Sequence, residues 1–496
     1  MSWTREKRYR SYSSWSNNEI KNLKIQAENS PYKPGYHISP LSGLLNDPNG
    51  FSYFNGKWHV FYQSFPFGPV HGLKSWVHCI SDDLVHWSNL GNELVPSTKY
   101  DSHGVYSGSA LAIKNNLLLA YTGNVRDKSW QRTSFQNGAL MNQQGQITKI
   151  EQPLIRQPQH VTEHFRDPQL LRDSENYYIL LGAQDKKTLK GEFSWFKSID
   201  LKNWEDMGYL KHPFKDLGYM VECPNLVFVD GHPVLIFCPQ GLPQKELKYK
   251  NIYPNVYSVG TSFDFSSGTF NGEPDSLSNL DDGFDVYASQ AFTAPNGTTY
   301  LISWIGLPEI KYPTDQENWA HCLSLVKKLH FEDGHLLQTP LSAQKKLSIK
   351  KSELITAPSI AGIQEVNENA DQQYELELSI DADQEGNLLL ASSKDHKQGI
   401  QMSFNTAQNG NLTVDRSKAG IQFASKYGTK RSIKLPHQQS LNLNIFIDHS
   451  VCEIFVNKGE NVLTLRYFAP QKNTKIAFIS NNGIKYSGRY TKLTDM

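Results

Sequence analysis

The sequence lacks the features that would tie it to a membrane, a metal or a disulfide framework. No run of about 18 apolar residues occurs, and the N-terminus, MSWTREKRYRSYSSW, is charged with no apolar stretch of signal-peptide length. We therefore expect a cytoplasmic protein without membrane contact. The five cysteines are scattered and include no C-x-x-C pair, so neither a zinc site nor a set of disulfides is indicated.

The balance of charge argues against a polyanionic partner. Lys and Arg number 50 against 49 Asp and Glu, a net charge of +1 with no basic tract, which excludes a nucleic-acid partner. Hydrophobic residues are few, at 38%, whereas aromatic residues reach 12%. This balance favours many short strands with aromatic-lined clefts, and a length of 496 residues implies two or three domains.

One short motif recurs along the first two thirds of the chain. LNDPNGF at 45–51 would by itself predict only a turn, but it returns as FRDPQLL at 165–171 and ECPNLVF at 222–228. The prolines fall at 48, 168 and 224, so the first gap of 120 residues is about twice the second gap of 56. A missing unit is expected near 108, where VYSGSALAI lies, and one more period leads to VYASQAF at 286–292. Five units of roughly 60 residues result.

Between these markers lie short apolar or alternating runs bounded by Gly, Asn, Asp or Pro, which are typical of strands. SDDLVHW at 81–87 and SIDLKNW at 198–204 share the pattern S-x-D-L-x-x-W and lie 117 residues apart, again two periods. A period of this length with about four strands per unit predicts a five-bladed β-propeller, in which the innermost strands line a central channel.

The period ends after residue 340, and the chain is predicted to have four parts. Residues 1–35 form a partly helical extension, 36–340 the propeller, 341–354 a linker and 355–496 a β-sandwich, because strands there alternate regularly with turns every 8 to 12 residues. The fold class is therefore all-β. We expect the sandwich to be a scaffold or an oligomer contact rather than a carbohydrate-binding module.

The repeats carry three carboxylates, Asp47, Asp167 and Glu222, which we expect at equivalent places at one mouth of the channel. Gathered carboxylates are costly, so they indicate a functional site. Two carboxyl groups in an aromatic-lined pocket suit glycoside hydrolysis, with one as nucleophile and one as acid. Asp47, beside two Asn amides, is expected to stay ionised, and Glu222, among apolar and neutral neighbours, to be the acid. Arg166 is expected to hold Asp167 in its charged form.

These motifs, in this order and spacing, resemble glycoside hydrolase family 32, the β-fructosidases, together with FYQ at 61–63, YSGS at 106–109, GFDVYASQ at 283–290 and ENWAHCLSL at 317–325. WTRE at 3–6 and FPFGPVHG at 65–72 are similar to bacterial cytosolic members that hydrolyse sucrose-6-phosphate. The resemblance implies a propeller followed by a sandwich, retention through a fructosyl-enzyme intermediate, and no cofactor or metal.

By matching motifs, the resemblance implies that Asp47 is the nucleophile, Glu222 the acid/base and Asp167 the transition-state stabiliser. The remaining implied substrate-binding residues are Leu44, Leu45, Asn46, Gln63, Tyr106, Ser107, Arg166 and Trp304. Many members carry Glu-Trp-Gly where this chain has Val70-His71-Gly72. The smaller and chargeable imidazole of His71, with Lys74 three residues on, is expected to hold the phosphate of the leaving glucosyl unit.

The sequence leaves two other functions open. An intracellular exo-hydrolase of fructans or fructo-oligosaccharides would share every catalytic residue and differ only beyond the fructosyl site. A non-catalytic sugar-binding propeller is the more remote reading, because such a protein would tolerate the loss of any carboxylate. The expected partner is a small sugar, either sucrose-6-phosphate, sucrose or a short fructo-oligosaccharide, and an oligomer could form through the sandwich.

Overall fold

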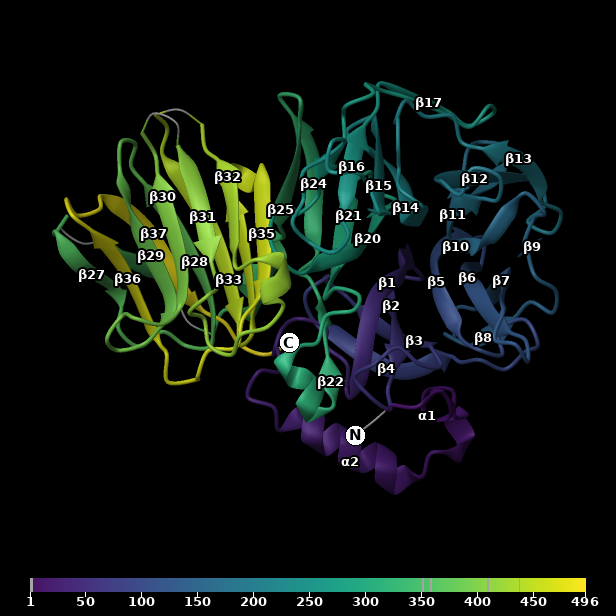
Figure 1. Ribbon diagram of the computed structural model, residues 1–496, viewed down its shortest axis with the longest axis horizontal. Helices are drawn as coiled ribbons and strands as arrows, with labels where there is room; N and C mark the ends of the chain where they lie inside the picture. The colour runs from purple at the N-terminus through teal and green to yellow at the C-terminus, as the bar shows by residue number, and fades with distance from the viewer. Residues whose placement is uncertain (1–2, 350–351, 357–358, 408–409, 437) are drawn as a thin grey trace.

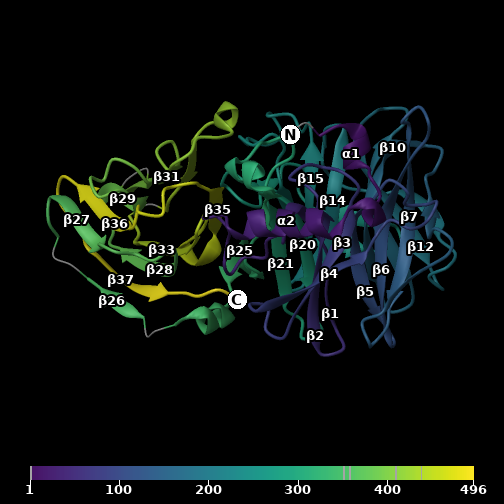
Figure 2. The ribbon, with the colours of Figure 1, turned by 90° about the horizontal axis from the view of Figure 1, so that it is seen from below.

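The computed structural model describes residues 3–349, 352–356, 359–407, 410–436 and 438–496. Outside the described residues lie 1–2 of the predicted extension, 350–351 of the predicted linker, and 357–358, 408–409 and 437 of the predicted sandwich. The propeller and the β-sandwich lie side by side, with a short helical segment along one edge of the propeller (Figure 1, Figure 2). In the described part of the chain, no helix has the length and apolar composition needed to cross a membrane.

Five antiparallel sheets form the blades of the propeller, which confirms the predicted fold class. Blade one contains β1 (Gly43–Phe54), β2 (Lys57–Phe65), β3 (Ser75–Ser81) and β4 (Trp87–Leu94), and blade two β5 (Val105–Ile113), β6 (Asn116–Arg126), β7 (Arg132–Met141), β8 (Ile147–Lys149) and β9 (Ile155–Arg156). Blade three contains β10 (Val161–Arg172), β11 (Tyr177–Asp185), β12 (Gly191–Ser198) and β13 (Glu205–Tyr209).

Blade four contains β14 (Met220–Val229), β15 (His232–Gln240), β16 (Val256–Val259) and β19 (Ser278–Asn279), with β17 (Ser262–Asp264) and β18 (Thr269–Asn271) as a separate hairpin. Blade five contains β20 (Val286–Thr293), β21 (Thr299–Ile305), β23 (Cys322–Leu323), β24 (Lys327–Glu332) and β25 (His335–Pro340). The ring is closed by β22 (Trp319–Ala320), which leaves blade five and pairs in parallel with β1.

Two six-stranded sheets form the sandwich. One contains β26 (Glu353–Ile355), β37 (Tyr486–Lys492), β28 (Gln373–Ile380), β33 (Leu441–Asp448), β34 (Val451–Val456) and β35 (Asn461–Arg466). The other contains β27 (Gly362–Asn367), β36 (Lys475–Ser480), β29 (Glu385–Ser392), β30 (Ile400–Asn405), β31 (Asn411–Asp415) and β32 (Lys430–Lys434). Because β25 ends at Pro340 and β26 begins at Glu353, we propose that the domain boundary lies between them.

The N-terminal segment contains α1 (Arg5–Arg8) and α2 (Asn17–Glu28). Ser16 and Glu19 form a capping box that starts α2, since each side chain receives the backbone N–H of the other. Apolar side chains of this segment, such as Trp15, pack on Leu44 and Phe67 of blade one. The segment therefore covers the edge of blade one. The short 3₁₀ helices are Tyr12–Ser14, Pro313–Glu317, Ser342–Leu347, Ser425–Tyr427 and Asn457–Gly459.

The shared S-x-D-L-x-x-W pattern folds into the same turn in blades one and three. The backbone N–H groups of Leu84 and Leu201 each donate to the preceding serine hydroxyl at 2.9 Å. Both leucines have positive φ, 67° and 63°, which only a strongly defined turn imposes on a branched residue. The repeat in the sequence thus corresponds to a repeat in local hydrogen bonding.

Each innermost strand carries a β-bulge at the same place. At each bulge the innermost strand advances by three residues while its partner strand advances by two. These steps are Leu45 to Pro48, Val105 to Gly108, Arg166 to Gln169, Glu222 to Asn225 and Tyr287 to Gln290. A bulge of this kind breaks the ladder and turns a side chain away from its regular direction. Five bulges at one level therefore direct side chains towards the axis of the channel.

Directly after the bulges, one buried polar residue per blade binds the backbone of the next blade. Asn49 accepts from Gly108 N at 2.9 Å, Ser109 from Leu170 N at 2.7 Å, Gln169 from Leu226 N at 2.7 Å, Asn225 from Ala291 N at 3.4 Å and Gln290 from Phe51 N at 2.7 Å. We call these five residues the inter-blade belt. They satisfy backbone groups that the five separate sheets cannot pair with one another.

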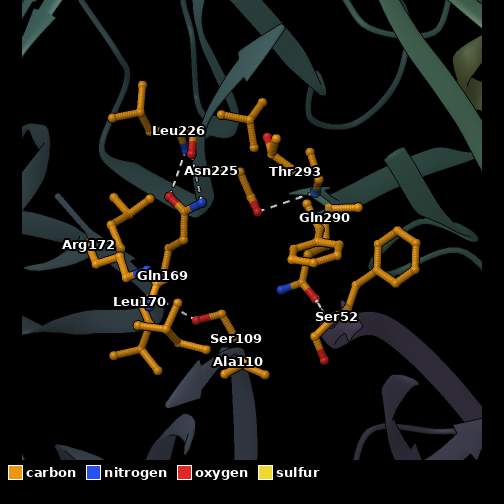
Figure 3. Close-up of a pocket in the computed structure, with 18 of the residues that line it drawn as sticks. Ser52, Ser109, Ala110, Gln169, Leu170, Arg172, Asn225, Leu226, Gln290 and Thr293 are labelled. Carbon is orange, nitrogen blue, oxygen red and sulfur yellow. Dashed lines mark hydrogen bonds between the residues drawn. The ribbon is translucent and has the colours of Figure 1, made fainter. Parts of the chain in front are cut away.

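Beyond the belt the channel opens into a second cavity of about 380 Å³ (Figure 3). Four belt residues, Ser109, Gln169, Asn225 and Gln290, surround this space in the close-up. The residues of the belt thus separate the two ends of the channel.

We predict that Gln169→Met destabilises the propeller. The substitution keeps the length of the side chain but removes its bonds to both Leu226 N and Leu226 O, leaving two buried backbone groups unpaired. The expected loss in the free energy of unfolding is about 2–4 kcal/mol, measured by urea unfolding. Gln159→Met, at an exposed position just before β10, is the control. Equal unfolding midpoints for the two variants would mean that the belt carries no such energy.

Candidate active site

The first residues of the five repeats surround a cavity of about 220 Å³ at one mouth of the channel. Three repeats carry a proline, at 48, 168 and 224, and Gly108 and Ser289 hold the equivalent position in the other two. The residues two places before this position form an outer ring: Asn46, Tyr106, Arg166, Glu222 and Tyr287. The next residue of each repeat forms an inner ring: Asp47, Ser107, Asp167, Cys223 and Ala288. Second strands add Gln63, Gln240 and Trp304 to the cavity wall.

The two rings correct the prediction that the three carboxylates are equivalent. Asp47 and Asp167 directly precede their prolines, whereas Glu222 lies two residues before Pro224. Cys223 therefore holds the equivalent place in blade four, with its Sγ 3.8 Å from Asp47 Oδ2 and 3.7 Å from Asp167 Oδ2. Burial raises the pKa of the Cys223 thiol, so the thiol stays protonated and neutral. A neutral group at this place avoids the repulsion that a third carboxylate next to Asp47 and Asp167 would cause.

Asp47 is surrounded by hydrogen-bond donors from blades one and two. Ser107 Oγ donates to its Oδ2, Gln63 Nε2 donates to the same oxygen at 3.3 Å, and Asn46 Nδ2 donates to its Oδ1 at 3.0 Å. These bonds favour the ionised form, but burial outweighs them and raises the pKa of Asp47 above its ordinary value. The expectation that neighbouring amides leave it simply ionised is therefore incomplete.

Asp167 differs from its prediction more sharply. The guanidinium of Arg166 does pair with Asp167 Oδ2, at 3.9 Å, but its shorter contact, at 2.7 Å, is to Glu222. Burial raises the pKa of Asp167 to about 7, with Arg166 opposing this and the charges of Glu222 and Asp47 adding to it. Its Oδ2 accepts the backbone N–H of Cys223 at 3.0 Å, and its φ of 68° places it in the left-handed region.

Glu222 is held by a set of polar donors rather than by the apolar neighbours expected from the sequence. Arg166 donates through Nε and Nη2 to Oε1 at 3.0 and 2.7 Å. Gln240 Nε2 and the Tyr287 hydroxyl each donate to Oε2 at 2.6 Å. Such a set fixes the position of the carboxyl group before a substrate arrives.

Four of the predicted substrate-binding residues do not line the cavity: Leu44, Leu45, Lys74 and Ser107. Leu44 and Leu45 are buried in apolar clusters of blade one. Lys74 is 2% exposed, and its Nζ donates to Asn46 Oδ1 behind the cavity wall. Burial lowers the pKa of Lys74 to about 7. The expectation that Lys74 binds a substrate phosphate is wrong, because its ammonium group is enclosed by protein.

His71 does lie at the rim of the cavity. Partial desolvation by the surrounding protein, together with the nearby Lys74, lowers the pKa of His71, although the residue keeps an exposed surface. The phosphate contact of His71 stays a prediction. The other predicted residues, Asn46, Gln63, Tyr106, Arg166 and Trp304, line the cavity, and Ser107 lies just beneath it.

The geometry can be compared with known families. Residues 37–340 match the model "Glycosyl hydrolases family 32 N-terminal domain", and residues 336–494 match "Glycosyl hydrolases family 32 C terminal". The chain belongs to glycosyl hydrolase family 32. The resemblance seen in the repeat motifs is thereby confirmed.

Relatives within family 32 match over nearly the whole chain. The sucrose-6-phosphate hydrolase of Streptococcus mutans is 46% identical over 491 residues, covering 98% of both chains. The structure of sucrose-6-phosphate hydrolase from Lactobacillus gasseri has a TM-score of 0.96 at 49% identity and covers 100% of both chains. A mutant of the Bombyx mori GH32 beta-fructofuranosidase, solved in complex with sucrose, has a TM-score of 0.82 at 28% identity, covering 96% of this chain and 97% of that one.

Sequence reasoning on this family 32 chain missed six residues that line the cavity: Arg132, His164, Cys223, Gln240, Tyr287 and Pro308. Aligning the five repeats residue by residue would have found Cys223 and Tyr287, which occupy the inner and outer rings. Arg132, His164 and Gln240 lie outside the repeat motif, and no sequence signal marks them. Among the described residues, no three His, Cys, Asp or Glu side chains gather in a way that could hold a metal ion.

We predict that Asp167→Asn raises stability at high pH relative to the wild type. The folded state binds the Asp167 proton more tightly than the unfolded chain does, so this group favours folding at low pH and loses that effect as pH rises from about 4 to about 7. The variant has no such titration. Its advantage in urea unfolding is expected to grow across this window and to stay level above pH 8.

The control is Asp82→Asn, which changes an exposed carboxylate. A stability difference between Asp167→Asn and the wild type that stays constant from pH 4 to pH 8 would contradict a raised pKa of Asp167.

Proposed function

We propose that the protein is a retaining β-fructofuranosidase that hydrolyses sucrose-6-phosphate and sucrose. The observation that carries this proposal is the convergence of Asp47, Asp167 and Glu222, from three different blades, on one cavity. The names and near-complete coverage of the bacterial relatives support the choice of substrate. The same sites would also serve a fructan exo-hydrolase, which no observation on the described residues favours.

The proposed first step forms a covalent bond to Asp47. One of its carboxylate oxygens attacks the anomeric carbon of the fructosyl unit, and the glycosidic C–O bond breaks with its electron pair on the leaving oxygen. Glu222 gives its proton to that oxygen. Asn46, Gln63 and Ser107 orient the nucleophile through their hydrogen bonds to it or to one another.

In the proposed second step, water releases the fructosyl unit. Glu222 accepts a proton from the water, whose oxygen bonds to the anomeric carbon as the bond to Asp47 breaks. Positive charge develops on the fructosyl ring in both steps, and we propose that Asp167 stabilises it. The pKa of Asp167 is about 7 in the free protein, and a positive charge beside it would lower this pKa and favour the ionised carboxylate.

The substrate proposal is tested by comparing kcat/KM for sucrose-6-phosphate, sucrose and a fructo-oligosaccharide. We expect the two sucrose substrates to be preferred. A fructo-oligosaccharide with the highest kcat/KM would overturn the proposal in favour of a fructan exo-hydrolase, and no turnover of any of the three would overturn catalysis.

We predict that Asp47→Ala and Glu222→Ala both remove most of the activity. Losing the nucleophile should lower kcat by about three orders of magnitude or more, and losing the acid by about 10²–10⁴-fold. An activated fructoside, whose leaving group needs no proton, should recover its first step with Glu222→Ala but not with Asp47→Ala. Glu205→Ala, exposed on β13, is the control. Rescue of both variants would contradict the division of roles.

We also predict that Ser107→Ala moves the acidic limb of the pH profile. The Ser107 hydroxyl donates to Asp47 Oδ2 and stabilises the ionised nucleophile, so its removal should raise the pKa of Asp47 further. The acidic limb of kcat/KM for sucrose is expected to move to higher pH by about one unit. Ser129→Ala, which removes a serine–carboxylate bond on the exposed β6–β7 turn, is the control. An unmoved limb would mean that Asp47 does not titrate there.

A further inference from the structure

Arg132 is a cation on the cavity wall that has no anionic partner. It is the first residue of β7, and its guanidinium carbon lies 6.0 Å from the centre of the Tyr106 ring. Its Nε is buried without a hydrogen-bond partner, and within the described ranges no carboxylate lies within ion-pair distance of it. An arginine in this state has its donors available for a ligand.

The register of blade two places Arg132 above the carboxylates. Val105, at the mouth of the channel, pairs with Gly123, which in turn pairs with Phe135. The β6–β7 hairpin continues outward for three more residues, to the pair formed by Arg126 and Arg132. At 3.3–3.4 Å per residue this is about 10 Å beyond the level of Val105. Arg132 therefore reaches the outer part of the cavity, where a leaving group lies, rather than the inner ring.

The surroundings of Arg132 are positively charged. Arg126, opposite it on β6, donates to the backbone oxygen of Trp130 at 3.0 Å and forms no ion pair in the part of the chain that the structure describes. Arg8, at the end of α1, donates to the backbone oxygen of His71 at 3.4 Å across the rim and is likewise unpaired among the described residues. Both have a buried Nε without a partner. The nearest acidic side chain of the hairpin, Asp127, is occupied by Ser129 and by the backbone of Gln131.

The other basic groups in and behind the cavity wall are engaged or have a lowered pKa. Arg166 is bound to Glu222, and Lys74 to Asn46. Burial and the cations Arg166 and Arg132 lower the pKa of His164 to about 4, so its ring is neutral near pH 7. Desolvation and the nearby Lys74 also lower the pKa of His71. Arg132 is thus the cation that lines the cavity with its charge uncompensated.

We propose that Arg132 binds the phosphate group on the leaving glucosyl unit of sucrose-6-phosphate, with Arg126 and Arg8 adding positive potential. This inference rests on the proposed function and names the residue that would select the phosphorylated substrate. The planar guanidinium can donate two parallel hydrogen bonds to phosphate oxygens, which a lysine cannot reproduce. The site recognises a phosphomonoester, so glucose 6-phosphate, the released product, should bind there as well.

The test compares two substrates in matched variants. For Arg132→Ala, the loss of kcat/KM on sucrose-6-phosphate should exceed the loss on sucrose by about 10- to 100-fold, as expected for hydrogen bonds to a charged group, and should lie mainly in KM. Arg132→Lys should recover part of this ratio. Lys128→Ala, which removes one positive charge from the exposed turn of the same hairpin, should leave the ratio unchanged.

A second readout does not depend on folding of a variant. Glucose 6-phosphate should inhibit the wild type more strongly than glucose does, and Arg132→Lys should reduce that difference. Equal losses on both substrates in Arg132→Ala would overturn the proposal, as would a larger change of the ratio in Arg8→Ala than in Arg132→Ala. A wild type that hydrolyses sucrose and sucrose-6-phosphate with equal kcat/KM would also overturn it while leaving the proposed function in place. Hydrolysis of neither substrate would instead refute the function itself.

Discussion

The meeting of five separate sheets at one axis is the constraint on which the rest of the structure depends. No strand pairs across the channel, so the backbone groups freed by the five bulges need other partners. The inter-blade belt supplies them, with one polar side chain of each blade bound to the next and Gln290 closing the circle onto Phe51. The catalytic candidates stand two or three residues before this belt, so their positions follow from it.

The same arrangement determines the electrostatics of the site. The bulges direct Asp47 and Asp167 into a space with little water, where burial raises the pKa of each. Donors from neighbouring blades limit this cost: Ser107 of blade two binds Asp47, and Arg166 of blade three binds Glu222 of blade four. The carboxyl groups of blades one and four are therefore held by side chains of neighbouring blades.

A second buried network joins the propeller to the sandwich. His37, which precedes blade one, lies 2.8 Å from Asp448 and 3.0 Å from Glu453 of the sandwich, and Lys327 of blade five lies 3.2 Å from Glu453. Although burial opposes it, these two carboxylates raise the pKa of His37 to about 9, so the imidazole is charged near neutral pH. Removing one member of this network would leave a buried charge without its partner. The network therefore holds the propeller and the sandwich in one relative position.

By itself the sequence determined the architecture and the identity of the three carboxylates, because a repeat of about 60 residues with a fixed motif leaves few folds and marks the same strand in every blade. It did not decide which groups touch. Arg166 lies closer to Glu222 of blade four, at 2.7 Å, than to its neighbour in sequence Asp167, at 3.9 Å. Lys74, close to His71 along the chain, points behind the cavity wall, whereas Arg132, from a third strand, lines the cavity. Only the tertiary structure decided these points, because burial and pairing depend on the direction in which each bulged strand turns its side chains and on neighbours from other blades.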